Sequence, residues 1–275
     1  MNQEATKSLP IGVFDSGVGG LTVLKALRES LRGEDLVYLG DTARLPYGTK
    51  SPASIERYAL QATRHLQERG IKLLVVACNT ASAVALEALR AKMNPLPVIG
   101  VVEPGASAAV AAGKGAEHLV LATEATVGLR AYREAILARD PTASVTELAC
   151  ELLVSLAEEG WTTGSIATGV AGRYLEQLPP EKRAPDCVIL GCTHFPLLAG
   201  AIAGVVPPAT KIVDSASTTA AAAALMLDEL GLSRDSRAAG KLTLLATDGA
   251  RRFARVGGRF LGEELSAGDI ELVDL

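Results

Sequence analysis

The sequence contains few aromatic residues and no long run of basic ones. Phe, Trp and Tyr make up 4% of its 275 residues, and 27 Lys and Arg stand against 31 Asp and Glu, which leaves a net charge of −4. Proteins that bind nucleic acids usually present a basic face to the phosphates and aromatic rings to the bases. The composition therefore argues against a nucleic-acid-binding protein.

Long apolar segments are also missing. Residues 1–10 lack the apolar stretch of a signal peptide, and the longest charge-free, Ala-rich run, residues 215–227, is too short to cross a bilayer. Hydrophobic residues nevertheless make up 48% of the chain, which is enough for a buried core and incompatible with disorder. We therefore expect a globular, cytoplasmic protein that does not contact membranes.

Short apolar runs of strand length alternate with helical patterns along most of the chain. Leucines recur at helical spacing over residues 21–31, and Ser51-Pro52 supplies a cap and a first-turn proline for a later helix. Apolar strands that alternate with helices are typical of an α/β fold with parallel sheets covered on both faces. The expected strands are residues 11–14, 36–39, 73–77, 98–102, 119–122, 188–190, 212–213 and 242–246.

One type of corner occurs twice in the chain. The apolar run 73–77 leads into residues 78–80 (Cys-Asn-Thr), and the run 188–190 leads through a glycine into residues 192–194 (Cys-Thr-His). A repeated strand–cysteine–helix corner suggests two related α/β lobes, each with a mostly parallel sheet flanked by helices. The expected lobes are residues 1–97 plus 211–275 for the first and residues 98–210 for the second.

The cysteines at these corners differ from the other two by their position. Cys78 and Cys192 each follow a strand and precede a helix, whose positive end stabilises a thiolate. Cys150 and Cys187 fit the usual pattern of inert, buried cysteines. A disulfide between Cys78 and Cys192 stays open, as does zinc bound by Cys187, Cys192 and His194, although that spacing is not a standard zinc pattern. Free thiols are the default in a reducing compartment.

A glycine-rich turn follows the first expected strand. Residues 15–20 read Asp-Ser-Gly-Val-Gly-Gly, which is not the glycine spacing of a dinucleotide site, and the carboxylate of Asp15 would repel a pyrophosphate. Nucleotide binding is therefore disfavoured. Asp15 can instead cap the following helix or face a ligand, and the two roles are compatible.

Several segments in a fixed order resemble a known family of enzymes. Together they are typical of the glutamate racemases, within the aspartate/glutamate racemase family, whereas any one of them alone would be a weak signal. The matching segments are residues 11–21, 40–48, 77–82, 100–105, 190–197 and 213–216.

The resemblance implies racemisation of L-glutamate to D-glutamate without any cofactor or metal, and a supply of D-glutamate for peptidoglycan. It implies an active site in the cleft between two pseudosymmetric lobes, with Cys78 and Cys192 as the acid/base residues. Asp15 would support Cys78, His194 would support Cys192, and Glu158 matches a further acidic residue of the site. The substrate-binding positions carried over are Asp15, Ser16, Tyr47, Gly48, Asn79, Thr80, Thr123, Thr193 and His194. We also expect a homodimer.

The chemistry itself explains why two cysteines are needed. Inverting an α-carbon requires removal of a proton from one face and delivery of a proton to the other, and one base cannot easily reach both faces. A thiol has an ordinary pKa of about 8.5, so one cysteine can act as thiolate while the other acts as thiol. Helix-end amides near Ser16, Asn79, Thr80 and Thr193 suit the carboxylate that must take up the carbanion's charge.

The sequence departs from the family pattern at four positions. Glu151 and Ser155 stand where prolines are usual, Leu129 replaces a serine, and Phe195 replaces the tyrosine after Cys-Thr-His. These changes lie in the second expected lobe and leave both corner cysteines in place.

Other functions remain open at this point. A racemase of aspartate or hydantoin would keep both cysteines and change the recognition of the side chain, although residues 46–48 (Pro-Tyr-Gly) favour glutamate. A related decarboxylase would typically need one cysteine. A two-lobed protein that binds an acidic ligand without chemistry is the alternative from a different class.

Overall fold

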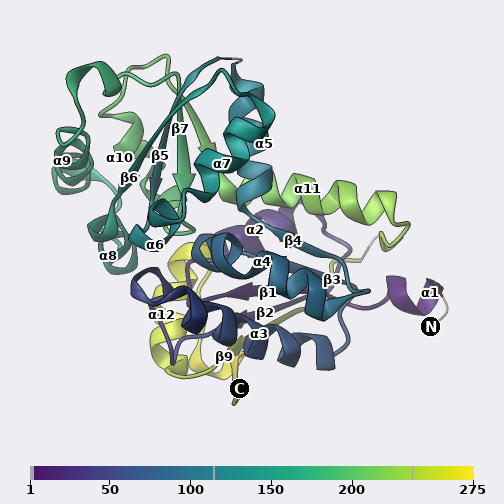
Figure 1. Ribbon diagram of the computed structural model, residues 1–275. Helices are drawn as coiled ribbons and strands as arrows, with labels where there is room; N and C mark the ends of the chain where they lie inside the picture. The colour runs from purple at the N-terminus through teal and green to yellow at the C-terminus, as the bar shows by residue number, and fades with distance from the viewer. Residues whose placement is uncertain (1–2, 114, 237) are drawn as a thin grey trace.

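The computed structural model describes residues 3–113, 115–236 and 238–275. Two α/β lobes lie one above the other in Figure 1, and each is built around a sheet whose neighbouring strands run parallel. The fold class predicted from the alternation of apolar runs and helices is therefore confirmed. Among the described residues, no helix combines the length and the hydropathy needed to span a membrane.

The first lobe contains a six-stranded sheet in the order β10-β9-β2-β1-β3-β4. Its central strands are fully buried, as expected for a parallel sheet covered on both faces. The strands are β1 (Ile11–Asp15), β2 (Leu36–Gly40), β3 (Leu73–Val76), β4 (Val98–Gly100), β9 (Leu242–Ala246) and β10 (Ile270–Leu272).

Helices cover both faces of this sheet. The core on one face joins the sheet to α2, α11 and α12, and the core on the other face joins it to α3 and α4. These helices and the shorter ones of this lobe are α1 (Gln3–Lys7), α2 (Leu21–Ser30), η1 (Tyr47–Thr49), α3 (Pro52–Glu68), α4 (Asn79–Met93), α11 (Ser215–Glu229), α12 (Ala250–Leu261) and η4 (Ala267–Asp269).

The second lobe contains a four-stranded sheet in the order β6-β5-β7-β8. Its strands are β5 (Glu117–Ala122), β6 (Ser144–Ala149), β7 (Cys187–Gly191) and β8 (Lys211–Asp214). Its helices are α5 (Val102–Ala112), α6 (Glu124–Gly128), α7 (Ala131–Arg139), α8 (Glu151–Glu159), α9 (Gly164–Leu175), η2 (Pro180–Lys182), η3 (Phe195–Leu198) and α10 (Ala199–Ala203).

The apolar core is continuous between the lobes. One cluster of buried side chains includes Val13 and Leu24 of the first lobe together with Leu121 and Leu190 of the second. The helices that link the lobes, α5 and α11, also pack against each other. This shared core holds the carboxyl ends of the two sheets near one another.

Local signals explain where several helices begin. Ser51 accepts a hydrogen bond from the Ser54 amide and Pro52 opens α3, as predicted from the sequence. The carboxylate of Asp214 accepts hydrogen bonds from the Ala216 and Ser217 amides and so caps α11. Such caps satisfy amides that have no partner within the helix.

The eight predicted strands are all present, with ends shifted by a few residues. The structure adds β6 and β10, which we did not predict. Both are edge strands: most of β6 is only partly buried, and two of the three residues of β10 are exposed. An edge strand need not be apolar throughout, so neither gave a continuous apolar run.

The predicted lobe boundaries are wrong by one strand at each crossing. We placed 98–210 in the second lobe, but β4 pairs with β3 in the first sheet. We placed 211–275 in the first lobe, but β8 pairs with β7 in the second sheet. The chain enters the second lobe through α5, after completing β4, and returns to the first lobe through α11, after completing β8. The boundaries were wrong because short apolar runs do not show which strands pair.

Candidate active site

A small cavity of about 60 Å³ lies where the lobes meet, beyond the carboxyl ends of β1, β3, β5 and β7. This is the edge at which open parallel sheets bind ligands. Every predicted substrate-binding residue except Asp15 lines it, together with both corner cysteines. The lining residues are Ser16, Pro46, Tyr47, Gly48, Cys78, Asn79, Thr80, Thr123, Glu151, Val154, Cys192, Thr193 and His194.

Cys78 enters the cavity from the first lobe. It is the N-cap of α4, its buried sulfur accepts a hydrogen bond from the Ala81 amide at 3.4 Å, and its thiol donates to Ser16 Oγ at 3.4 Å. Burial, and after it the negative charge of Asp15, together raise the pKa of Cys78 to about 12. At neutral pH this side of the cavity therefore presents a protonated thiol.

Asp15 ends β1 and lies behind this wall without lining the cavity. Its Oδ2 accepts a hydrogen bond from the Gly17 amide at 2.8 Å, while its buried Oδ1 has no hydrogen-bond partner among the described residues. Burial raises the pKa of Asp15, and the positive charge of His194 opposes that rise. A buried carboxyl group with a free oxygen can take up or release a proton near Cys78.

Cys192 enters the cavity from the second lobe with a different set of partners. Its sulfur lies 3.7 Å from His194 Nδ1, and the other ring nitrogen, Nε2, lies 3.2 Å from Glu158 Oε1. Burial lowers the pKa of His194, but the contacts with Cys192 and Glu158 outweigh it and raise this pKa to about 10. His194 is therefore an imidazolium at neutral pH.

Glu158 does not line the cavity, and it supports His194 from behind. The hydrogen bond with His194 is the main cause that holds the pKa of Glu158 below its usual value. Its second oxygen accepts a hydrogen bond from Arg252 at 2.8 Å, and the ring of Phe260 meets His194 edge-on with centroids 5.0 Å apart. Arg252 and Phe260 belong to α12 and were not predicted, because their pattern is that of an ordinary amphipathic helix.

Polar side chains of the two lobes also meet at this cavity. Thr80 lies 3.0 Å from Thr123, oxygen to oxygen, and Thr123 lies 3.1 Å from Thr126. Tyr132 donates a hydrogen bond to Asn79 Oδ1 at 2.7 Å, and the buried Nδ2 of Asn79 has no partner among the described residues. That amide nitrogen can donate to a ligand in the cavity. Thr126 and Tyr132 were also missed, because single polar residues on helices carry no sequence signal.

Tyr47 and Gly48, in η1, form another part of the cavity wall, next to α4 and α6. The Tyr47 hydroxyl donates to Asp41 Oδ2 at 2.5 Å, so it is already engaged, and burial raises its pKa well above the ordinary value. A side chain at Gly48 would place a Cβ 3.0 Å from Thr123 of the other lobe. Glycine is therefore what lets the two lobes approach at this point.

The four departures from the family pattern lie at different depths. Glu151 lines the cavity and its Oε1 accepts a hydrogen bond from the Glu124 amide at 2.6 Å, at the start of α6. Phe195 is fully buried, whereas Ser155 and Leu129 are exposed. Of the four, Glu151 alone adds a charged group to the cavity wall.

The alternatives for the cysteines are not supported. All four are free thiols, so Cys78 and Cys192 form no disulfide. Cys187 begins β7 and Cys192 follows its last residue, which separates them by about 16 Å at 3.3 Å per residue. The described part of the chain contains no group of three His, Cys, Asp or Glu residues able to hold a metal ion.

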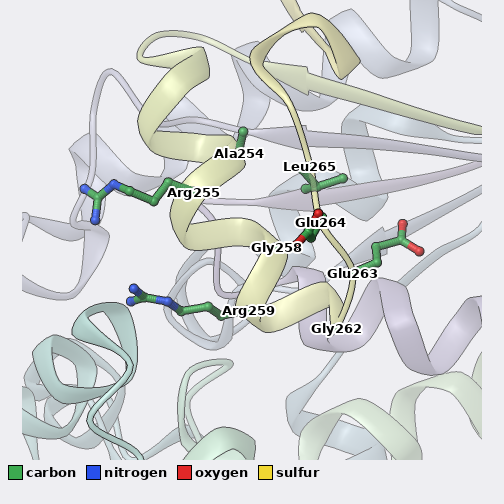
Figure 2. Close-up of a pocket in the computed structure, with 8 residues that line it drawn as sticks. All are labelled: Ala254, Arg255, Gly258, Arg259, Gly262, Glu263, Glu264 and Leu265. Atoms are coloured by element: carbon green, nitrogen blue, oxygen red, sulfur yellow. The ribbon is translucent and has the colours of Figure 1, made fainter.

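A larger hollow lies elsewhere, on the surface between α12 and the segment that follows it. Figure 2 shows its lining residues, among them Arg255, Arg259 and Leu265, and its volume is about 570 Å³. It contains none of the predicted site residues. The small cavity between the lobes is therefore the candidate site.

The sequence and the fold match one class of protein. A family profile described as Asp/Glu/Hydantoin racemase matches residues 11–223. The chain belongs to this family, which confirms the resemblance found in the sequence, and it is an amino-acid racemase, an isomerase.

Three similar proteins illustrate the relationship. The chain is 47% identical to the glutamate racemase of Geobacter metallireducens, over 96% of each chain. It superposes on the glutamate racemase of Francisella tularensis in complex with D-glutamate with a TM-score of 0.89, at 35% identity and over 98% of each chain. It also superposes on the glutamate racemase of Thermus thermophilus in complex with beta-chloro-D-alanine, with a TM-score of 0.86, 42% identity and 98% of each chain covered.

Proposed function

We propose that this protein interconverts L- and D-glutamate without a cofactor, with Cys78 and Cys192 acting on opposite faces of the α-carbon. The observation that carries the proposal is that each lobe sends one buried cysteine into the same small cavity. Glutamate as the substrate is supported by the relatives, which are glutamate racemases, one of them in complex with D-glutamate. The D-glutamate formed would supply peptidoglycan synthesis.

The environments of the two sulfurs suit opposite roles at the start of a turnover. Cys78 carries a proton, because burial and Asp15 hold its pKa at about 12. Cys192 lies 3.7 Å from the His194 imidazolium, and we assign to it the role of the base. The Cys192 thiolate then takes the α-proton of one enantiomer, and the Cys78 thiol delivers its proton to the opposite face. The other enantiomer uses the same steps in reverse.

The electron pair left on the α-carbon needs stabilisation while neither proton is bound. It spreads into the substrate carboxylate, which amides at the start of α4 and the free Nδ2 of Asn79 can hold. Hydroxyl groups of Ser16 and Thr193 line the same cavity and can donate to it. Each cysteine ends the turnover in the protonation state that its partner had at the start.

Proton NMR of glutamate in D2O tests this proposal. Each enantiomer is incubated separately with the enzyme, and the α-proton signal is followed together with the optical rotation. We expect product from the first turnovers to carry deuterium at the α-carbon. Exchange or racemisation with aspartate and not glutamate would replace glutamate as the substrate, and no exchange with either would indicate a binding protein.

A further inference from the structure

One carboxylate links the lobes directly behind His194. Glu158, near the end of α8, contacts His194 through Oε1 and accepts a hydrogen bond from Arg252 through Oε2. Its backbone oxygen accepts a second hydrogen bond from Arg259 at 2.7 Å. Figure 2 shows Arg259 projecting from α12 away from Leu265. Both arginines therefore hold Glu158 from the opposite lobe.

Glycine makes this approach possible. Gly160 ends α8 with a φ of +78°, and a Cβ at this position would lie 3.0 Å from the Arg259 guanidinium. The last turn of α8 is thus shaped so that α12 can reach the Glu158 backbone.

We infer that Arg252 is a positioning residue for proton transfer at Cys192: it holds the Glu158 carboxylate against His194 so that the imidazole stays on the sulfur. The inference rests on the proposed function. Arg252 does not line the cavity and so touches neither the substrate nor the reacting atoms.

The geometry supports an effect through orientation. A glutamate side chain has three rotatable bonds, and with His194 as its sole partner it could turn toward solvent. The ion pair with Arg252 occupies the second oxygen, and the ring of Phe260 packs against the imidazole. The charged groups that act on His194 are Cys192, Glu158 and the more distant Asp15.

This support serves one half of the proposed reaction. Cys78 depends on Ser16 and Asp15, and Arg252 acts through Glu158 and His194 alone. Because enantiomers have equal free energies, kcat/KM must fall equally in both directions when any step is slowed. The deuterium isotope effect on kcat/KM can differ between the two directions, because it depends on how far removal of the α-proton limits the rate in that direction.

The first measurement is the kinetics of Arg252→Met. We expect kcat to fall by about three- to fivefold with KM unchanged, the size typical of a partly exposed ion pair. Arg252→Lys should recover most of the loss. The matched control is Arg251→Met, since Arg251 is exposed on the same helix and has no hydrogen-bond or ion-pair partner among the described residues. It should keep the wild-type rate.

The second measurement separates positioning from a structural role. With α-deuterated L- and D-glutamate, Arg252→Met should raise the isotope effect on kcat/KM for the enantiomer that Cys192 deprotonates and lower it for the other. His194→Asn should change the two isotope effects in the same directions as Arg252→Met does. Asp15→Asn should change each of them in the opposite direction. A lower melting temperature with unchanged isotope effects would overturn the inference.

The outcomes also distinguish this inference from the proposed function. A wild-type enzyme that does not racemise glutamate contradicts the proposed function. A wild-type enzyme that does so, with Arg252→Met indistinguishable from it, contradicts the role of Arg252 alone.

Discussion

The two halves of the cavity look alike in sequence and differ in electrostatics. Each half places a cysteine between a parallel strand and a helical segment, yet Cys78 has a buried carboxyl group behind it and Cys192 has an imidazolium. The first environment raises the pKa of its thiol, and the second places a positive charge beside the other sulfur. A nearly symmetrical scaffold can thus hold an acid and a base on opposite sides of one cavity.

The largest expected effect comes from removing either cysteine, because racemisation needs both halves of the cavity. Cys78→Ala and Cys192→Ala should each lower the rate of racemisation by about a thousandfold or more, because each removes proton transfer on one face. Circular dichroism of glutamate solutions measures the rate. Cys187→Ala, at the far end of β7, is the control and should stay active. A Cys192→Ala enzyme near the wild-type rate would contradict the proposed pairing.

The raised pKa of His194 should make the stability of the protein depend on pH. The folded pKa of His194, about 10, lies above its ordinary value of 6.5, so its contribution is fully present below pH 6.5 and is lost as pH rises toward 10. We expect the free energy of unfolding to fall by on the order of 3 kcal/mol between pH 7 and pH 10. Urea unfolding of wild type and His194→Asn measures it. Equal slopes in the two proteins would show that His194 is not the cause.

The Asp15 carboxylate should affect the reactivity of the Cys78 thiol. Asp15→Asn removes a negative charge that raises the pKa of this thiol, so alkylation by iodoacetamide at pH 8 should accelerate by about tenfold, the effect of one pKa unit. The measurement uses the Cys192→Ala background, with the labelled peptide identified by mass spectrometry. Unchanged labelling would mean that Asp15 is not charged in the folded protein.

The smallest effect should come from the contact between Tyr132 and Asn79, which joins the two lobes. Tyr132→Phe removes the hydrogen bond to Asn79, which is worth about 1 kcal/mol, and lets the amide rotate. We expect KM for glutamate to rise by about fivefold. Tyr174→Phe is the control, since the Tyr174 hydroxyl bonds the Leu152 amide outside the cavity lining. An equal change in both variants would argue against a role for Asn79 in binding.

Much of the candidate site was predictable because its residues stand at strand ends. Ser16 follows β1, Asn79 and Thr80 follow β3, and Thr193 follows β7, and the carboxyl ends of parallel strands converge whatever the rest of the chain does. The edge strands β6 and β10 were not predictable in this way, since partial exposure removes the apolar run.

Glu158 and Asn79 were predicted as site residues, but their partners Arg252 and Tyr132 could not be read from the chain. Glu158 and Arg252 are 94 positions apart, and Asn79 and Tyr132 are 53 apart. Each of these side chains lies on a helix where its type is unremarkable. Only their meeting between the lobes gives them a role.

The sequence by itself determined the α/β class, the central strands and the two cysteine corners, because strand runs, caps and turns depend on neighbouring residues. Tertiary structure decided which sheet β4 and β8 join, and that α12 supports His194. The physical reason is the range of the interactions. The apolar pattern of a strand or helix depends on residues that are close in the sequence. Sheet pairing, and the environments that shift the pKa values of Cys78 and His194, exist only once distant segments pack together.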